Sequence, residues 1–412
     1  MVSMPSPTPA LPLQSIRVID LGHEWACPHA ARFLADFGAE VIKVEYPKRL
    51  DFLRGALTQD RAYDGKVPFW QVHRNKKSII LDLRDPSDRG IFEALVAESD
   101  IVLENSRPGV MERLELGYER LRQIKPDIIL VSMSAFGLSG PQSHYRGYGG
   151  TIEALAGIQS LTGYGPDQPP RRIREMDVTN GIMGASAALS ALEARQRTGQ
   201  GEWIDLSEAE AASHALLGEF VLDQAVNGSH VQPNGNRHSE FAPQGCYPCQ
   251  GEDSWLVLTV QSEAEWQSLC QLLVHPEMAD DPRFDSPLER HRHHDLIDLL
   301  ISDWSSAMPV LQACDELQAA GIAAGPVLSM LELSADDHLR QRDYFQSPQT
   351  DPNHDRYPGF PFRLSRGDGR LVSRGPDLGS HNQEIVCDLL GLPESSVPLI
   401  DESKLGTSFD PL

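Results

Sequence analysis

The sequence predicts an α/β protein, with a Rossmann-like parallel sheet in a large domain and a smaller α+β domain after it. Short apolar runs rich in β-branched residues alternate with segments of helical spacing over roughly the first half of the 412 residues. The helical segments between them are long enough to return the chain to the start of the next strand. Strands separated in this way are typical of βαβ units, which build a parallel sheet.

Six segments of the first half have the pattern of buried strands. Each is a short, mostly apolar run bounded by polar or turn-forming residues. They are Ile16–Leu21, Glu40–Glu45, Ser78–Leu83, Asp100–Glu104, Asp127–Ser134 and Glu202–Leu206.

Four helices are predicted between these strands. The first, His29–Phe37, stops at Gly38, a favoured residue just past a helix end. The second, about Ser87–Ala97, follows Asp85 and Pro86, which together form a start signal. A third lies near Tyr118–Ile124, and a long fourth helix, about Val178–Arg197, is unusually rich in Gly, Ala and Ser. Small residues of this kind favour tight packing against a neighbouring element.

Composition shifts divide the chain into four parts. Residues 1–14 are Pro-rich and are predicted to be a disordered arm. Residues 15–227 form the large Rossmann-like domain, and residues 228–328 the small α+β domain, which begins after a polar, turn-rich stretch. Residues 329–412 are expected to return to the large domain.

The overall charge excludes several classes of protein. Lys and Arg number 36 and Asp and Glu 59, so the net charge is −23. A nucleic-acid binder or a polybasic membrane-surface protein needs a basic face instead. No apolar stretch approaches the roughly 20 residues of a membrane span, and residues 1–12 lack the features of a signal peptide. Six scattered cysteines form no disulfide framework, which favours the cytoplasm.

One segment departs from the acidic average. Residues 43–77 contain nine basic side chains, including Arg74 and Lys76, against four acidic ones, a net charge of +5. A local basic surface in an acidic protein favours an anionic small ligand. A solvated basic loop is the alternative for any one of these residues.

The turn after the first strand argues against a dinucleotide-binding protein. Its residues are Gly22-His23-Glu24-Trp25-Ala26-Cys27-Pro28, which do not match the G-x-G-x-x-G fingerprint. No P-loop lysine motif is present either. The predicted fold therefore brings no prediction of NAD binding with it.

Asp177 immediately precedes the long small-residue helix. An aspartate there is expected as an N-cap, which would be a purely structural role. The same position also suits catalysis, because the helix N-terminus stabilises a carboxylate and offers N–H groups to an oxyanion. The residue alone leaves both interpretations open.

Several long motifs occur together in one order. They are Leu34–Glu45, Asn75–Ser78 with Leu81–Leu83, Glu104–Leu114 leading to Ser134–Pro141, Asp177 with Arg197–Gly201, Gly235–His238 and Ala279–Phe284. With these motifs the chain resembles the class III CoA-transferase family (CaiB/BaiF, formyl-CoA transferase-like) over about residues 15–392.

The resemblance implies an activity and a set of site residues. Asp177 is similar to the family's catalytic aspartate, which forms an anhydride and an aspartyl-CoA thioester. Asn105 and Arg113 match CoA contacts, Arg146 and Tyr148 match the CoA and acyl channel, and His23 and Trp25 match the active-site loop. Arg74 and Lys76 are then expected at a basic entrance for the CoA phosphates.

The resemblance also implies partners. CoA and its thioesters are substrates, with a carboxylic acid as acceptor, and neither a metal nor a permanently bound cofactor is expected. Family members form interlocked homodimers, so a homodimer is predicted here as well.

Some features depart from the family or belong to other candidate sites. Cys27 replaces a usual glycine in the active-site loop, and the glycine-rich lid of oxalate-specific members is not visible. Cys246 and Cys249 have no second cysteine pair for zinc. The run His291, His293 and His294 has the spacing of an exposed helical turn rather than of a metal site.

Two alternatives remain for the function. An acyl-CoA racemase of the same family would use a histidine with Asp177, but the matching position is Tyr148, a poor base near neutral pH. An intramolecular CoA shift would use the same aspartate. From another class, the chain would be a non-catalytic CoA-binding partner subunit, which would not need Asp177.

Overall fold

The computed structural model describes residues 11–55, 62–165, 167–348, 350, 355–367 and 369–406. The chain divides into two compact units. The first comprises residues 1–159, 172–229 and 341–412, and the second comprises residues 160–171 and 230–340. Since compactness does not show that either unit folds alone, the domain boundaries proposed from the sequence stay a prediction.

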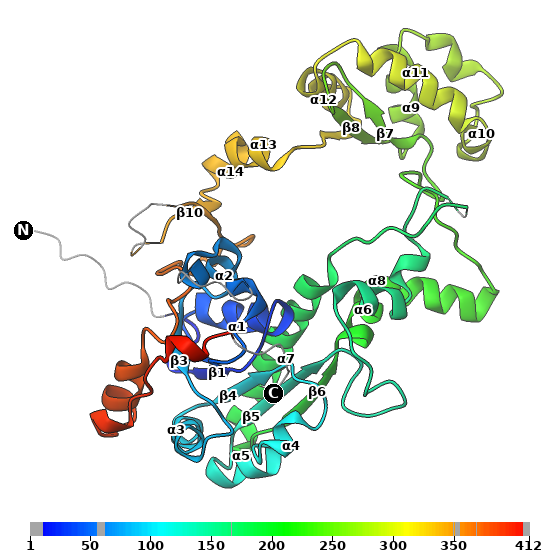
Figure 1. Ribbon diagram of the computed structural model, residues 1–412. Helices are drawn as coiled ribbons and strands as arrows, with labels where there is room; N and C mark the ends of the chain where they lie inside the picture. The colour runs from blue at the N-terminus through cyan, green and yellow to red at the C-terminus, as the bar shows by residue number, and fades with distance from the viewer. Residues whose placement is uncertain are drawn as a thin grey trace, which may run out of the picture. The chain divides into compact units, whose positions relative to one another are not determined.

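The first unit is built on a six-stranded parallel sheet, as predicted (Figure 1). Its strands lie in the order β3-β2-β1-β4-β5-β6, the strand order of the Rossmann fold. Their bounds are β1 Arg17–Asp20, β2 Glu40–Glu45, β3 Lys76–Ile80, β4 Ile101–Glu104, β5 Ile129–Ser134 and β6 Trp203–Ser207. The direction in which strands are added reverses between β1 and β4. The strands β2 and β3 extend from β1 toward one edge of the sheet, and β5 and β6 extend from β4 toward the other.

Both faces of this sheet are covered, because successive residues of each strand point to opposite sides. On β1, Val18 belongs to the core under α1 (Ala26–Asp36) and α7 (Met176–Thr198), whereas Ile19 belongs to the core under α3 (Pro86–Ala97) and α5 (Tyr118–Ile124). The strands are therefore apolar on both sides, which explains why they appear in the sequence as continuous apolar runs.

Further elements complete the first unit. The helices are α2 Val67–Val72, α4 Val110–Arg113, α6 Gly149–Leu155 and α8 Glu208–Asn227, with α14 Asp337–Gln341 at its boundary. The helix α8 was not predicted separately. Two short strands pair as β10 Phe345–Gln346 with β11 Tyr357–Pro358. A π-helical segment spans Glu384–Leu389.

The small residues of α7 allow it to lie directly against α1. A Cβ atom added to Gly181 would come within 2.7 Å of the His29 ring and 3.1 Å of the Ala26 carbonyl oxygen. One added to Gly184 would lie 2.6 Å from the Met133 sulfur. The predicted tight packing of this helix is therefore present.

Substituting Gly181 by Ala should destabilise the protein, although alanine is the better helix former by about 1 kcal/mol. The added methyl group meets backbone and ring atoms, and overpacking of this kind costs about 1–3 kcal/mol. We expect the denaturant midpoint of Gly181→Ala to fall. Gly218→Ala on α8, where nothing lies within 4 Å of the added Cβ, should raise it slightly, and equal midpoints for the two variants would contradict the packing argument.

Part of the predicted N-terminal arm is ordered. Leu11–Gln14 forms a turn, and the Leu13 backbone N–H donates to the Phe37 carbonyl at 3.1 Å. Leu13 also packs against the core under α1. The expectation of disorder over residues 11–14 is therefore wrong, because an apolar residue in the arm finds a place on the core. Residues 1–10 lie outside the described part of the chain.

The second unit has an antiparallel sheet in the order β7-β8-β9, with bounds Gln244–Pro248, Trp255–Thr259 and Ala323–Pro326. Its helices are α9 Glu263–Leu272, α10 Pro287–Arg292, α11 His294–Ser306, α12 Val310–Ala319 and α13 Met330–Ala335. Trp266, Phe284 and Ile301 lie in its core. His294 is buried there too, rather than on an exposed turn as expected, because its Nε2 accepts from the Gln244 N–H at 3.3 Å.

All six cysteines are free thiols. In the described ranges, no helix combines the length and the apolar character needed to cross a bilayer.

Candidate active site

A pocket of about 340 Å³ opens at the carboxyl ends of the strands in the first unit. It is lined by residues 23–26 after β1, 105–108 after β4, 133–135 at the end of β5 and 145–149 before and at the start of α6, together with Arg49, Asp177 and Glu208. This is the point where the strand order reverses, and open parallel sheets bind their ligands there. Its volume suits a small ligand or the reactive part of a larger one.

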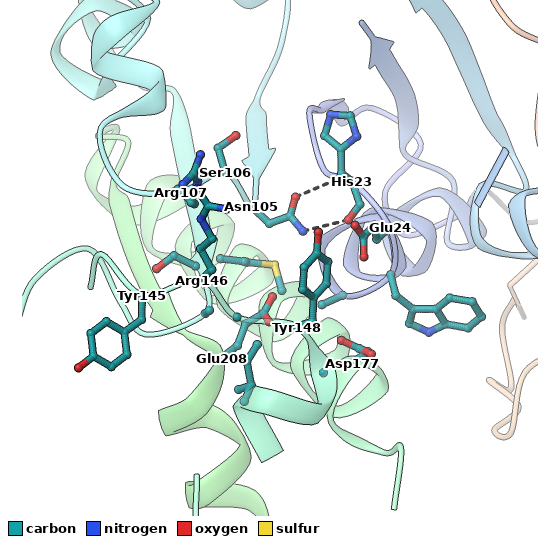
Figure 2. Close-up of a pocket in the computed structure, with 18 of the residues that line it drawn as sticks. His23, Glu24, Asn105, Ser106, Arg107, Tyr145, Arg146, Tyr148, Asp177 and Glu208 are labelled. Atoms are coloured by element: carbon teal, nitrogen blue, oxygen red, sulfur yellow. Dashed lines mark hydrogen bonds between the residues drawn. The ribbon is translucent and has the colours of Figure 1, made fainter. Parts of the chain in front are cut away.

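The loop after β1 is held in place by its backbone (Figure 2). The Asn105 side chain accepts from the His23 N–H at 2.8 Å and donates to the His23 carbonyl at 3.0 Å. The Glu24 N–H donates to an Asp51 carboxylate oxygen at 3.2 Å, and Glu24 itself has a left-handed backbone, with φ of 66°. A strained residue between such anchors is typical of a functional loop.

A cluster of buried charged residues anchors this loop. Lys76 Nζ donates to Asp20 at 2.7 Å and to the Pro28 carbonyl at 2.7 Å. Lys43 Nζ donates to the Gly22 carbonyl and lies 3.6 Å from Asp51. Burial alone would raise the pKa of Asp20, yet Lys76 and Lys43 hold it below its usual value. The loop is therefore fixed by ion pairs that water does not reach.

Cys27, the residue that departs from the family pattern, does not line the pocket. It is fully buried in the core under α1, and its Sγ would lie 2.6 Å from a Cβ added to Gly22. Burial raises the pKa of the thiol well above its usual value, and the Asp20 carboxylate adds to this. The thiol is therefore neutral and packs against the turn.

Asp177 is not the N-cap of its helix, so that expectation was wrong. The helix α7 starts one residue earlier than Asp177, and Glu175 occupies the cap position. Asp177 therefore lies in the first helical turn, with its side chain free to point into the pocket (Figure 2). Among the residues that the structure describes, none donates a hydrogen bond to its carboxylate.

The Asp177 carboxyl is largely enclosed, and two nearby charged residues act on its pKa. Burial raises the pKa of its carboxyl, Arg172 opposes this, and Glu153 adds to it, so that the pKa lies above its usual value. A Cβ added to Gly149 would lie 3.0 Å from Asp177 Oδ2 and would clash with Arg172. The glycine at the start of α6 therefore leaves room beside the carboxylate.

Two further carboxyl groups line the same pocket, Glu24 and Glu208. Burial raises the pKa of Glu24, and the nearby Asp51 raises it further. Burial also raises the pKa of Glu208, to about 8, with smaller contributions from Asp177 and Glu24. Three carboxyls that cannot all ionise readily in one pocket are characteristic of sites that handle acyl or proton chemistry.

Three arginines line the pocket as well: Arg49, Arg107 and Arg146. None of them forms an ion pair with another residue in the described ranges. Unpaired cations at one opening of a protein with net charge −23 make a local site for an anionic ligand. Arg61, part of the same basic segment, lies outside the described residues.

Most of the predicted site residues meet at this pocket. His23, Trp25, Asn105, Arg146, Tyr148 and Asp177 all line it. Burial lowers the pKa of His23 to about 3, with Lys43 adding to the effect, so the imidazole is neutral; its ring points away from Asp177 (Figure 2). Tyr148 is 62% exposed at the start of α6, so its side chain is accessible to a ligand.

Arg74 and Lys76 are not brought to the pocket, which corrects their predicted place at a basic entrance. Arg74 is buried, with its guanidinium on Asp36 at 2.8 Å, and Lys76 is buried on Asp20. Both follow α2 in a segment that enters the sheet, where their charges are neutralised. Arg113 is exposed at the end of α4 and does not line the pocket; its contact with CoA stays a prediction.

Four charged residues of the pocket were not among the predicted site residues: Glu24, Arg49, Arg107 and Glu208. Arg49 belongs to the basic segment and Arg107 to the motif after β4, so the sequence contained a feature that could have indicated each of them. Glu208 is the first residue after the Ser207 N-cap of α8, where an acidic residue is common. Nothing local to the sequence distinguishes a buried glutamate there from an ordinary acidic helix start.

Comparisons with known proteins agree with this site. Residues 13–382 match CoA-transferase family III. The chain is 35% identical to succinyl-CoA–D-citramalate CoA-transferase from Chloroflexus aurantiacus over 407 residues, which cover 98% of this chain and 100% of that protein. It is also 35% identical to acetyl-CoA:oxalate CoA-transferase from Acetobacter aceti over 329 residues, covering 79% of this chain and 82% of the relative.

A solved structure shares the fold. A CaiB/BaiF family protein from Brucella suis superposes with a TM-score of 0.83 at 30% identity, covering 92% of this chain and all of that one. A nearly full-length family match, relatives named as CoA-transferases and a pocket at the strand ends all agree. The chain therefore belongs to CoA-transferase family III, the class III or CaiB/BaiF family, and is a CoA-transferase.

Proposed function

We propose that this enzyme moves CoA from an acyl-CoA donor to a carboxylic acid acceptor through a covalent aspartyl-CoA thioester on Asp177. The observation that carries the proposal is the Asp177 carboxylate itself. It lines the pocket, lacks a hydrogen-bond donor in the described part of the chain and is not used as a helix cap. A carboxylate with so little stabilisation is well suited to attack a carbonyl carbon.

The first half of the reaction loads CoA onto the enzyme. An Asp177 oxygen attacks the donor's thioester carbonyl, which forms a mixed anhydride and expels CoA as a thiolate. The thiolate then attacks the aspartyl carbonyl of the anhydride. This forms the aspartyl-CoA thioester and releases the donor acid as a carboxylate. No net proton or electron is gained or lost.

The second half reverses these steps with the acceptor. The acceptor carboxylate attacks the aspartyl-CoA carbonyl, which gives a second anhydride and again frees the thiolate. The thiolate attacks the acceptor's acyl carbon, so that the new acyl-CoA forms and the Asp177 carboxylate is restored. The helix N-terminal field of α7 favours the negative charge that develops at the aspartyl oxygen in the two steps that attack the aspartyl carbonyl.

The pocket offers partners for both substrates. The unpaired Arg49, Arg107 and Arg146 suit an anionic acid and the CoA phosphates. The anchored loop after β1 keeps one wall in a fixed place, which limits the positions that a bound acyl group can take. Succinyl-CoA and acetyl-CoA are the first donors to assay, with citramalate and oxalate as acceptors, because these occur in the relatives' names.

Trapping the intermediate tests the proposal. Hydroxylamine added during turnover attacks an aspartyl thioester or anhydride, and gives an aspartyl hydroxamate with release of CoA or acid. Peptide mass analysis should then find the hydroxamate on the peptide that contains Asp177. Transfer activity without any modified Asp177 peptide would overturn the covalent mechanism.

Arg113→Ala should weaken binding of CoA esters through KM and leave kcat unchanged, since the arginine would hold donor and transition state alike. The side chain is exposed, so an ionic contact of about 1 kcal/mol corresponds to about fivefold in KM. A charge-assisted hydrogen bond to phosphate, about 1.5–3 kcal/mol, would raise KM more than tenfold. The exposed Arg122 on α5 gives the control variant Arg122→Ala, and an unchanged KM for every CoA ester in Arg113→Ala would exclude Arg113 as a ligand.

The interlocked homodimer implied by the resemblance and the cytoplasmic location favoured by the cysteine pattern stay predictions. So do the domain boundaries proposed from the sequence.

A further inference from the structure

Glu208 is the feature of the pocket that the proposed mechanism leaves unused. It is the first residue of α8, and its side chain lines the pocket that contains Asp177 (Figure 2). Only 6% of the residue is exposed, yet no described residue hydrogen-bonds to its carboxyl group. A buried polar group without a partner costs free energy, which is offset when a ligand supplies the partner.

A second unpartnered group lies beside it. The Ser134 hydroxyl is buried without a hydrogen-bond partner at the end of β5 and lines the same pocket. Ser134 is the register partner of Ser207, the residue before Glu208. Ser134 at the end of β5 and Glu208 directly after β6 therefore both present a polar group to the pocket without a partner among the described residues.

The charge of Glu208 decides what it can bind. Burial, followed by Asp177 and Glu24, raises the pKa of its carboxyl to about 8. At neutral pH the group is therefore a carboxylic acid, with one O–H to donate. An ionised glutamate there would instead repel any incoming carboxylate.

We propose that Glu208 is a neutral hydrogen-bond donor that holds the carboxylate of the acceptor acid beside Asp177. This inference rests on the proposed function, because it assigns the residue to the second substrate of that reaction. The Ser134 hydroxyl would share the task. The arrangement lets a carboxylate enter a pocket that already contains three carboxyl groups.

Other ionisable groups line the pocket and are part of the expected pH response. Carboxyls come from the loop after β1 (Glu24) and from α7 (Asp177), and guanidinium groups come from Arg49, Arg107 and Arg146. Burial lowers the pKa of the His23 imidazole to about 3, so this ring stays neutral well below neutral pH. Glu208 is therefore the lining group expected to change charge near pH 8.

Two variants of nearly equal size separate the roles of Glu208. Glu208→Gln keeps a hydrogen-bond donor but cannot ionise, whereas Glu208→Leu removes the donor.

In the parent, the KM for citramalate with succinyl-CoA should rise above about pH 8, as Glu208 ionises. In Glu208→Gln that rise should vanish, with near-parental KM at pH 7. In Glu208→Leu the KM should be raised about 10- to 100-fold at every pH. The control is Glu210→Gln on the exposed side of the same helix, which should behave as the parent.

Two readouts distinguish failure of this inference from failure of the covalent mechanism. Hydroxamate formation at Asp177 with succinyl-CoA alone reports the first half-reaction and should be equal in all four proteins. Independently of turnover, an infrared difference spectrum between parent and Glu208→Gln at pH 7 should contain the carbonyl band of a protonated carboxyl, and adding succinate should shift it.

A Glu208→Gln variant that loses affinity for the acceptor as Glu208→Leu does, or a parent without that infrared band, would overturn the inference. So would an unchanged acceptor KM in Glu208→Leu.

Discussion

Replacing Asp177 by Asn should reduce CoA transfer by at least about a thousandfold while the fold and the binding of CoA esters survive. The asparagine amide has nearly the same shape but no nucleophilic oxygen. Asp177 receives no hydrogen bond from a described residue, so the substitution removes none of the described contacts. Its pKa is raised by burial, so an uncharged side chain is tolerated at least as well. Steady-state rates, CoA-ester affinity and thermal midpoint of the variant measure the three parts of this expectation.

Two companion variants make the result specific. Glu175→Gln alters the residue that occupies the N-cap position and should leave the rate within a factor of about two. Asp177→Ala should be as inactive as Asp177→Asn. An Asp177→Asn enzyme with near-parental activity, together with no hydroxamate in the parent, would end the role of Asp177 as nucleophile. A reaction without a covalent aspartyl intermediate, such as that of an acyl-CoA racemase of the same family, would then be the hypothesis to test.

Replacing Lys76 by Met should lower the free energy of unfolding by about 3–5 kcal/mol, a large share of the stability of an ordinary protein. The ammonium group is fully buried, and it is the cation hydrogen-bonded to the buried Asp20 carboxylate. Its loss leaves that carboxylate without its closest cation and removes a bond to the Pro28 carbonyl. Denaturant unfolding monitored by circular dichroism measures the change.

Neighbouring Lys77 is the matched control, because its side chain is 31% exposed and its ion pairs with Glu40 and Glu384 lie at the surface. Lys77→Met should cost about 1 kcal/mol or less. If Lys76→Met does not fold, adding Asp20→Asn should recover part of the stability, since the unpaired charge is then gone. A stable Lys76→Met enzyme with a raised KM for CoA esters would instead restore Lys76 to the CoA site.

The strand-and-helix order was predictable from the sequence because it is encoded locally. Glu40–Glu45 and Tyr118–Ile124 have the predicted bounds, and the apolar runs show that both faces of the sheet are buried. Motif resemblance then predicted the family, and six residues of the pocket were among the predicted site residues. These features depend on residue types at short spacing, which the sequence displays directly.

What only the tertiary structure decided is which charged residue is buried and which faces the pocket. Arg74 and Lys76 are basic residues in a basic segment, as Arg49 is, yet the first two are neutralised in the core by Asp36 and Asp20. Glu208 looks like an ordinary helix start until burial keeps its carboxyl neutral. Asp177 was a candidate N-cap from the sequence, but α7 begins at Met176, so Asp177 is the second residue of the helix. Burial and ion pairing depend on contacts between residues far apart in the chain, so the charge and exposure of these groups follow from the folded arrangement and not from local spacing.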